Sequence, residues 1–190
     1  MGVRVVVVGI AGVGKSTVID RVSKKLDGIS VRVFGTVMFE EAKRLRWVKH
    51  RDEMRKMPVE KQKRLQKIAA QKLSRSKGRY TLVDTHLFIR TSEGFWPGLP
   101  LEVINALKPT HLVLVEATPD EILSRRMKDT SRYRDVITRE EVDYELDLAK
   151  TLLASASLVS GAPMLIVRNE EGRAEKAAET ISNAIVGNLS

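Results

Sequence analysis

The sequence predicts an α/β protein in which a five-stranded parallel β-sheet lies between layers of helices. Short apolar runs rich in β-branched residues alternate with longer segments of helical periodicity along most of the 190 residues. This alternation is typical of a parallel sheet with helical crossovers. The first apolar run, residues 3–8, leads through a glycine-rich loop into an amphipathic helix. The length fits a single domain, residues 1–190, with room for small inserts.

The hydrophobic periodicity places each element in turn. Strands are predicted at residues 3–8, 30–35, 80–84, 111–116 and 163–168, and helices at 15–26, 36–46, 58–76, 100–107, 119–128, 139–160 and 172–187. Thr118 and Thr138 are each followed three residues later by a glutamate, which is the pattern of a capping box. Two stretches, residues 49–57 and 129–137, break the periodicity. We predict a short lid at 129–137, because a polar segment with few core residues opens at low cost.

The glycine-rich loop carries the strongest chemical signal. It reads Gly9-Ile10-Ala11-Gly12-Val13-Gly14-Lys15-Ser16-Thr17 and matches the phosphate-binding pattern G-x-x-x-x-G-K-S/T. Glycines let backbone N–H groups curl around an anion, and the helix N-terminus adds the positive end of its dipole. Lys15 then supplies charge to the β- and γ-phosphates, and Ser16 offers a hydroxyl to Mg²⁺. The loop therefore predicts a nucleoside triphosphate site formed by residues 9–17.

A carboxylate and several arginines follow the predicted strands. Asp84 ends the apolar run 80–84, the position from which an aspartate holds the metal shell beside such a loop. We therefore predict that Ser16 and Asp84 hold Mg²⁺, partly through water. Arg90 lies just beyond the same strand, near the sheet edge where open α/β proteins bind ligands. His86 is interpreted as a structural histidine.

An arginine cluster occupies a helix end and the segment after it. Phosphoryl transfer needs positive charge on the transferring oxygens more than it needs acid–base groups. We therefore predict catalytic roles for Lys15, Arg90, Arg132 and Arg134, and a triphosphate contact for Arg125. The alternative is a solvated helix end, where basic residues suit the dipole. Arg51 and Arg55, one helical turn apart, form either a second phosphate site or an exposed ion-paired helix.

Composition narrows the possible classes. The chain lacks cysteine, which excludes disulfides and thiolate metal sites and is typical of an intracellular protein. No apolar run reaches the 18 residues of a membrane span. The net charge of +9 is concentrated in residues 43–77, which hold fourteen Lys and Arg against three Asp and Glu. This basic segment is either a solvated helix pair or a surface that attracts anionic nucleotides.

With these motifs in order, the chain resembles the archaeal-type adenylate kinases. Besides the phosphate-binding loop, the resemblance rests on Arg51-Asp52-Glu53-Met54-Arg55-Lys56, Asp84-Thr85-His86, Ile89-Arg90-Thr91, Pro97-Gly98-Leu99-Pro100 and Leu123-Ser124-Arg125-Arg126-Met127-Lys128-Asp129-Thr130. It implies a three-layer phosphate-loop fold with an insert for the nucleoside monophosphate at about 35–76 and the lid at 129–137. It implies Mg²⁺-dependent, reversible phosphoryl transfer from ATP to AMP, giving two ADP, in a cytoplasmic homotrimer. By resemblance Arg90 holds the AMP phosphate, and Arg132 and Arg134 approach the transferred group.

The chain departs from the family pattern on the AMP side. Gly35-Thr36 stands where a Gly-Asp pair is expected, and Phe39 and Glu40 replace an arginine that many bacterial members carry. AMP contacts are therefore expected from Arg90 together with Gly35, Thr36, Arg51 and Arg55. Two other functions stay open: a kinase for CMP or UMP, and a nucleotide-regulated RNA-binding protein that uses the basic segment. A GTPase is disfavoured, because D-x-x-G and N-K-x-D motifs are missing.

Overall fold

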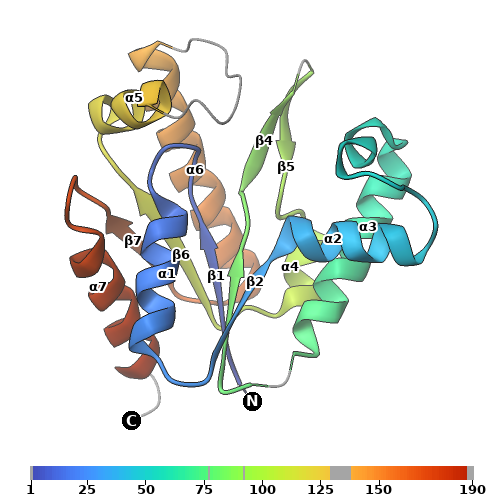
Figure 1. The fold of residues 1–190 in the computed structure, drawn as a ribbon, viewed down its shortest axis with the longest axis horizontal. Helices are drawn as coiled ribbons and strands as arrows, with labels where there is room; N and C mark the ends of the chain where they lie inside the picture. The colour runs from blue at the N-terminus through green and yellow to red at the C-terminus, as the bar shows by residue number, and fades with distance from the viewer. Residues whose placement is uncertain (1, 77, 92, 129–137, 188–190) are drawn as a thin grey trace.

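Five parallel strands form the central sheet in the order β2-β3-β1-β6-β7 (Figure 1). The computed structural model describes residues 2–76, 78–91, 93–128 and 138–187. The strands are β1 (Val3–Val8), β2 (Ile29–Val33), β3 (Tyr80–Asp84), β6 (His111–Glu116) and β7 (Met164–Arg168). The predicted five-stranded parallel sheet is confirmed. Because β1 lies in the centre, the loop that follows it emerges at the middle of the carboxyl edge of the sheet, between β3 and β6.

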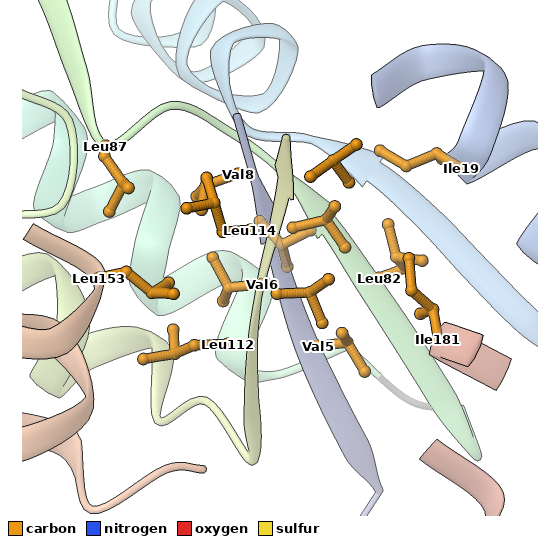
Figure 2. Packing of buried hydrophobic residues seen from close by; sticks show 14 of the residues in the cluster. Val5, Val6, Val8, Ile19, Leu82, Leu87, Leu112, Leu114, Leu153 and Ile181 are labelled. Carbon is orange, nitrogen blue, oxygen red and sulfur yellow. The ribbon is translucent and has the colours of Figure 1, made fainter. Parts of the chain in front are cut away.

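Helices cover both faces of the sheet and make three layers. They are α1 (Lys15–Lys25), α2 (Phe34–Arg44), α3 (Val59–Ser74), α4 (Leu101–Leu107), α5 (Pro119–Lys128), α6 (Arg139–Ser160) and α7 (Ala174–Gly187). Helix α1 packs against α7, whereas α6 packs against α4, α5 and β6. Figure 2 shows Ile19 of α1 and Ile181 of α7 on one side of the strands and Leu153 of α6 on the other. No described helix is both long enough and apolar enough to cross a lipid bilayer.

The core explains why the strands read as unbroken apolar runs. In β1, Val5, Val6, Val7 and Val8 are all at most 1% exposed, since both sheet faces are covered. Burial of one such side chain contributes about 1.5–3 kcal/mol. The strands therefore form a rigid frame that fixes the positions of the loops at their carboxyl ends.

Two elements lie outside the predicted pattern. An antiparallel hairpin of β4 (Phe88–Thr91) and β5 (Gly94–Pro97) rises from the sheet edge, with Arg90 opposite Phe95. A 3₁₀ helix, η1 (Arg51–Lys56), occupies the stretch between the two basic helices. Helices α2 and α3 with η1 also enclose a small apolar cluster of their own, centred on Ala42, Val48 and Leu65. This α2–α3 insert and the hairpin stand on the side of the molecule opposite α7 (Figure 1).

Helix ends follow the local signals closely. Both predicted capping boxes are present: the Thr118 N–H donates to Glu121 at 2.9 Å, and the Thr138 N–H donates to Glu141 at 2.9 Å. Helix α2 starts earlier than predicted, at Phe34, directly after β2. The predicted lid, residues 129–137, lies outside the described residues.

Candidate active site

The phosphate-binding loop connects β1 to α1 and is shaped by glycines. Gly12 and Gly14 have φ values of +91° and +79°, a left-handed conformation that other residues rarely adopt. At Gly14, which caps α1, a Cβ atom would lie 2.4 Å from the amide nitrogen of Asn169. The loop thus closes tightly on the neighbouring β7–α7 turn. Ser16 and Thr17, in the first turn of α1, are exposed at its positive end.

Lys15 is turned toward the end of β3. Its side chain is 9% exposed, and its Nζ donates to Asp84 Oδ1 and to the Thr85 carbonyl at 2.6 Å. The register of β1 and β3 brings Asp84 close to Lys15, because Asp84 lies beside Val7 at the end of β1. Burial lowers the pKa of Lys15, and the charge of Asp84 opposes that shift. The predicted phosphate lysine and the predicted metal carboxylate are therefore one ion pair in this structure.

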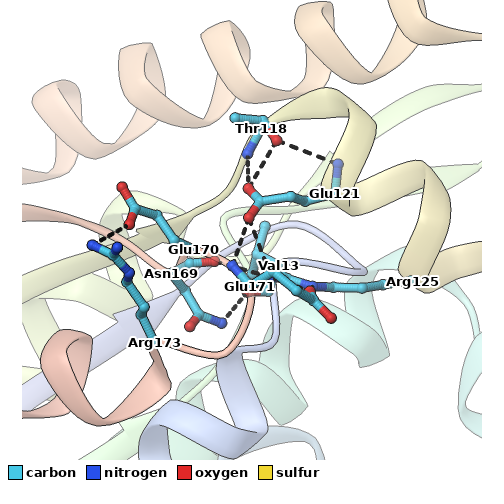
Figure 3. A network of polar contacts seen from close by, with 8 residues as sticks. All are labelled: Val13, Thr118, Glu121, Arg125, Asn169, Glu170, Glu171 and Arg173. Carbon is cyan, nitrogen blue, oxygen red and sulfur yellow. Dashed lines mark hydrogen bonds and ion pairs between the residues drawn. The ribbon is translucent and has the colours of Figure 1, made fainter.

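Arg125 and Asn169 brace the loop from outside (Figure 3). Arg125 donates to the carbonyls of Val13 at 3.2 Å and Asn169 at 3.1 Å, and it pairs with Glu171 at 3.0 Å. The amide of Asn169 donates to the same Val13 carbonyl at 2.8 Å. These contacts join α5, the phosphate-binding loop and the β7–α7 turn, so Arg125 adjoins the loop. A direct contact to the nucleotide stays a prediction.

A buried carboxylate joins two further arginines. Glu145 of α6 pairs with Arg126 at 2.9 Å and with Arg90 at 3.8 Å. Arg126 also donates to the Ala11 carbonyl of the loop at 2.8 Å. Arg90 donates to Glu141 at 2.6 Å, and this bond is the main cause of the lowered pKa of Glu141. The chain Ala11–Arg126–Glu145–Arg90 therefore links the triphosphate loop to the β4–β5 hairpin.

A cavity of about 250 Å³ lies between the hairpin and the start of α6. It is lined by Arg90, Phe95, Glu140, Glu141, Tyr144 and Glu145. Phe95 packs edge to face against Phe88 with ring centroids 4.9 Å apart, which holds the hairpin side of this space in place. Arg90 is 47% exposed here, so its guanidinium is partly accessible to solvent.

Three of the residues predicted to bind AMP, Gly35, Thr36 and Arg51, lie together in the insert. Arg51 of η1 donates to the Thr36 hydroxyl at 3.4 Å, and a Cβ on Gly35 would lie 3.0 Å from its guanidinium. The lack of a side chain at Gly35 thus leaves room for Arg51. The side chain of Arg55 is outside the described part of the structure. Arg132 and Arg134 also lie outside it, so their catalytic roles stay predictions.

Sequence reasoning does not single out Glu145 or Asn169, and it identifies Glu141 only as a capping-box residue. Glu145 has a local signal: it is a carboxylate on the face of α6 that buries Val142, Leu146 and Ala149. A charged residue in such a stripe indicates a buried partner. Asn169 carries no comparable signal. Among the described residues no cluster of three His, Cys, Asp or Glu could by itself hold a metal ion.

Comparisons with solved structures identify the fold. The chain aligns with shikimate kinase from Acinetobacter baumannii at a TM-score of 0.64, with 16% identity and coverage of 99% of this chain and 95% of the other. A Thermus thermophilus protein, TT1252, aligns at a TM-score of 0.59 with 15% identity, over 100% of this chain and 98% of the other. Such identities show the fold alone. Together with the glycine loop, they define the class as α/β proteins of the phosphate-loop fold.

Sequence comparison then gives the family. Residues 8–143 match a family model described as an AAA domain. The chain is 43% identical to an adenylate kinase of Pyrococcus horikoshii, over 96% of this chain and 92% of the relative. Identity is 40% to an adenylate kinase of Methanocaldococcus jannaschii, over 93% and 95%, and 41% to one of Thermoplasma acidophilum, over 96% and 98%. The chain belongs to the adenylate kinase family, and it is a phosphotransferase.

Proposed function

We propose that this enzyme transfers the terminal phosphoryl group of ATP to AMP reversibly and yields two ADP. The observation that supports this reaction best is that the same domain presents two separate groups of cationic side chains. Lys15 marks the phosphate-binding loop, whereas Arg90 on the hairpin and Arg51 on the insert offer cationic groups to a second phosphate-bearing substrate. Two phosphate-bearing substrates fit such an arrangement, and the adenylate kinase relatives supply the identity of both.

The Lys15–Asp84 pair suggests how ATP engages. The phosphates of the nucleotide offer Lys15 stronger acceptors than one carboxylate, so its ammonium moves from Asp84 to the β- and γ-phosphate oxygens. Asp84 then becomes available to a cation. Ser16 is exposed and the side chain of Asp84 is 16% exposed; both provide hard oxygen donors, which suit Mg²⁺ held with ATP and partly through water. Bound Mg²⁺ supplies charge neutralisation on the phosphates.

The acceptor side requires a similar exchange. Arg90 is paired with Glu141, and the AMP phosphate competes for the same guanidinium. A bidentate guanidinium–phosphate contact holds the acceptor more rigidly than a lysine does. We also propose catalytic roles for Arg132 and Arg134 in a lid at 129–137. Arg125 is proposed to contact the triphosphate. AMP contacts are proposed for Gly35, Thr36, Arg51 and Arg55. By family likeness we propose a homotrimer that acts in the cytoplasm.

Turnover with different acceptors tests the reaction. The purified enzyme with ATP and Mg²⁺ is expected to phosphorylate AMP with a higher kcat/KM than CMP or UMP. A higher value for CMP or UMP would replace the substrate assignment and leave the kinase class intact. The proposed assembly is tested by sedimentation equilibrium, in which a monomeric mass would contradict the trimer.

A further inference from the structure

The outer turn between α2 and α3 carries a group of exposed cations that the kinase chemistry does not use. We define it as the basic surface, formed by Lys43, Arg46, Lys49, Lys61 and Arg64. Figure 1 shows this turn at the edge of the molecule, with the β4–β5 hairpin standing between η1 and α5. The basic surface is therefore a candidate for binding an anion other than the two substrates.

Among the described residues, the side chains of these five cations form no ion pair, although Glu53 accepts a hydrogen bond from the backbone N–H of Lys49 at 2.9 Å. Within the described part of the chain, the ion pairs of the insert use other basic residues: Arg44 and Lys72 pair with Glu41, and Lys63 pairs with Glu60. None of the five members of the basic surface forms an ion pair with a described residue. Their charge is thus available to a partner.

Aromatic rings hold three of the cations in place. Lys61 Nζ lies 5.8 Å from the centroid of the Trp47 ring, and the Arg64 guanidinium lies 5.6 Å from it. Lys43 Nζ lies 5.6 Å from the ring of Phe39. A cation–π contact positions a side chain without cancelling its charge. The basic surface is therefore partly preorganised for an anionic partner.

Arg46 has a left-handed backbone conformation just after α2. It follows Leu45, the C-cap of α2. The Arg46 N–H donates to the Lys43 carbonyl and the Trp47 N–H donates to the Ala42 carbonyl, both at 2.9 Å, and these two bonds end the helix. This helix-ending motif favours glycine at the position of Arg46, which has φ +58°. An arginine in the left-handed region is strained. The helix-ending motif accepts glycine at this position, so Arg46→Gly removes the charge without disrupting the end of α2.

We propose that the basic surface binds the phosphate backbone of a nucleic acid. Phosphate contacts need dispersed Lys and Arg and little base recognition, and this surface offers that arrangement. An anionic membrane is a poorer fit, because the apolar face of α3, formed by Leu65, Ala69 and Leu73, is buried inside the protein. The binding is additional to the proposed phosphoryl transfer and does not depend on it.

The strained arginine allows a sharp test. Arg46→Gly removes one charge and relieves the strain, so the protein should unfold at a higher temperature and bind nucleic acid more weakly. Lys108→Gly is the matched control, because Lys108 is exposed, has φ +51° and caps α4 outside the basic surface. It removes the same charge and relieves similar strain. Both variants should keep the turnover of ATP with AMP.

Binding is measured by fluorescence anisotropy with a labelled 20-nucleotide poly(U) at 50–200 mM salt. One lost phosphate contact reduces the salt slope by about 0.7, which corresponds to about five-fold weaker binding at 0.1 M salt. That loss is expected for Arg46→Gly, about 25-fold for Lys61→Gln with Arg64→Gln, and little for Lys108→Gly. Three outcomes would overturn the proposal: no salt-dependent binding by the unmodified enzyme, equal losses for Arg46→Gly and Lys108→Gly, or equally tight binding to phosphatidylserine vesicles or poly-glutamate.

Discussion

Replacing Glu145 with glutamine tests whether a buried carboxylate connects the two halves of the site. The Glu145 side chain is 9% exposed, and that of its partner Arg126 is 12% exposed. Loss of one partner of a buried ion pair costs about 3–5 kcal/mol. Here Arg126 keeps its 2.8 Å bond to the Ala11 carbonyl, and Arg90 is 47% exposed and screened by water. We therefore expect Glu145→Gln to lower the free energy of unfolding by about 2 kcal/mol.

Urea denaturation and thermal unfolding both report this change. For a chain of this size, about 2 kcal/mol corresponds to a Tm lower by about 4–8 °C. Glu141→Gln is the control, since that carboxylate is 39% exposed and should contribute far less. A double variant, Arg126→Met with Glu145→Met, removes both charges. It should destabilise the protein less than Glu145→Met alone, because no unpaired buried charge is left. A free energy of unfolding for Glu145→Gln within about 0.5 kcal/mol of the unmodified enzyme would refute the reasoning.

Three further predictions follow from the charged groups. Lys15→Ala should lower kcat at least about 10²-fold with the fold intact, as steady-state kinetics and circular dichroism can show; a raised KM for ATP alone would contradict the role. Arg90→Lys should weaken the binding of AMP far more than the binding of ATP in separate calorimetric titrations, because an ammonium cannot reproduce the bidentate guanidinium contact. Equal losses of affinity for both nucleotides would contradict the role of Arg90 at the AMP phosphate. The pKa of buried Glu41 is lowered chiefly by its hydrogen bond from Lys72, so its ionised form stabilises the fold above the ordinary pKa of 4.5. When unfolding is measured from pH 7 to pH 3, the free energy of unfolding of Glu41→Gln should be lower than that of the unmodified enzyme, and this difference should shrink as the pH falls below 4.5. A difference that stays constant with pH would show that ionisation of Glu41 does not stabilise the fold.

Local signals account for most of what the sequence predicts about the fold. The strands, the phosphate-binding loop and the capped helices all rest on residues close together in the chain, such as Thr118 and Glu121. The β4–β5 hairpin is not predicted, because its strands have four residues each, too few for a clear alternation. Periodicity also cannot show that Phe34 begins a helix directly after a strand.

The candidate site, like the fold, is predicted from the sequence only in part. Functional roles for Lys15 and Asp84 are foreseen from their separate motifs, although the ion pair between them is not. The link from Arg126 through Glu145 to Arg90 is not foreseen either, because it depends on the packing of α6 against α5 and the hairpin. Propensity and spacing describe a residue's own element, whereas ion pairs across elements require the tertiary arrangement.

The hydrogen bond from Asn169 to Val13 has a consequence for how the enzyme is made. It spans 156 residues and fastens a loop near the start of the chain to a turn near its end. At about 5–20 residues per second, a ribosome adds the second partner roughly 8–30 seconds after the first. During that interval the nascent chain carries the complete glycine motif without its brace.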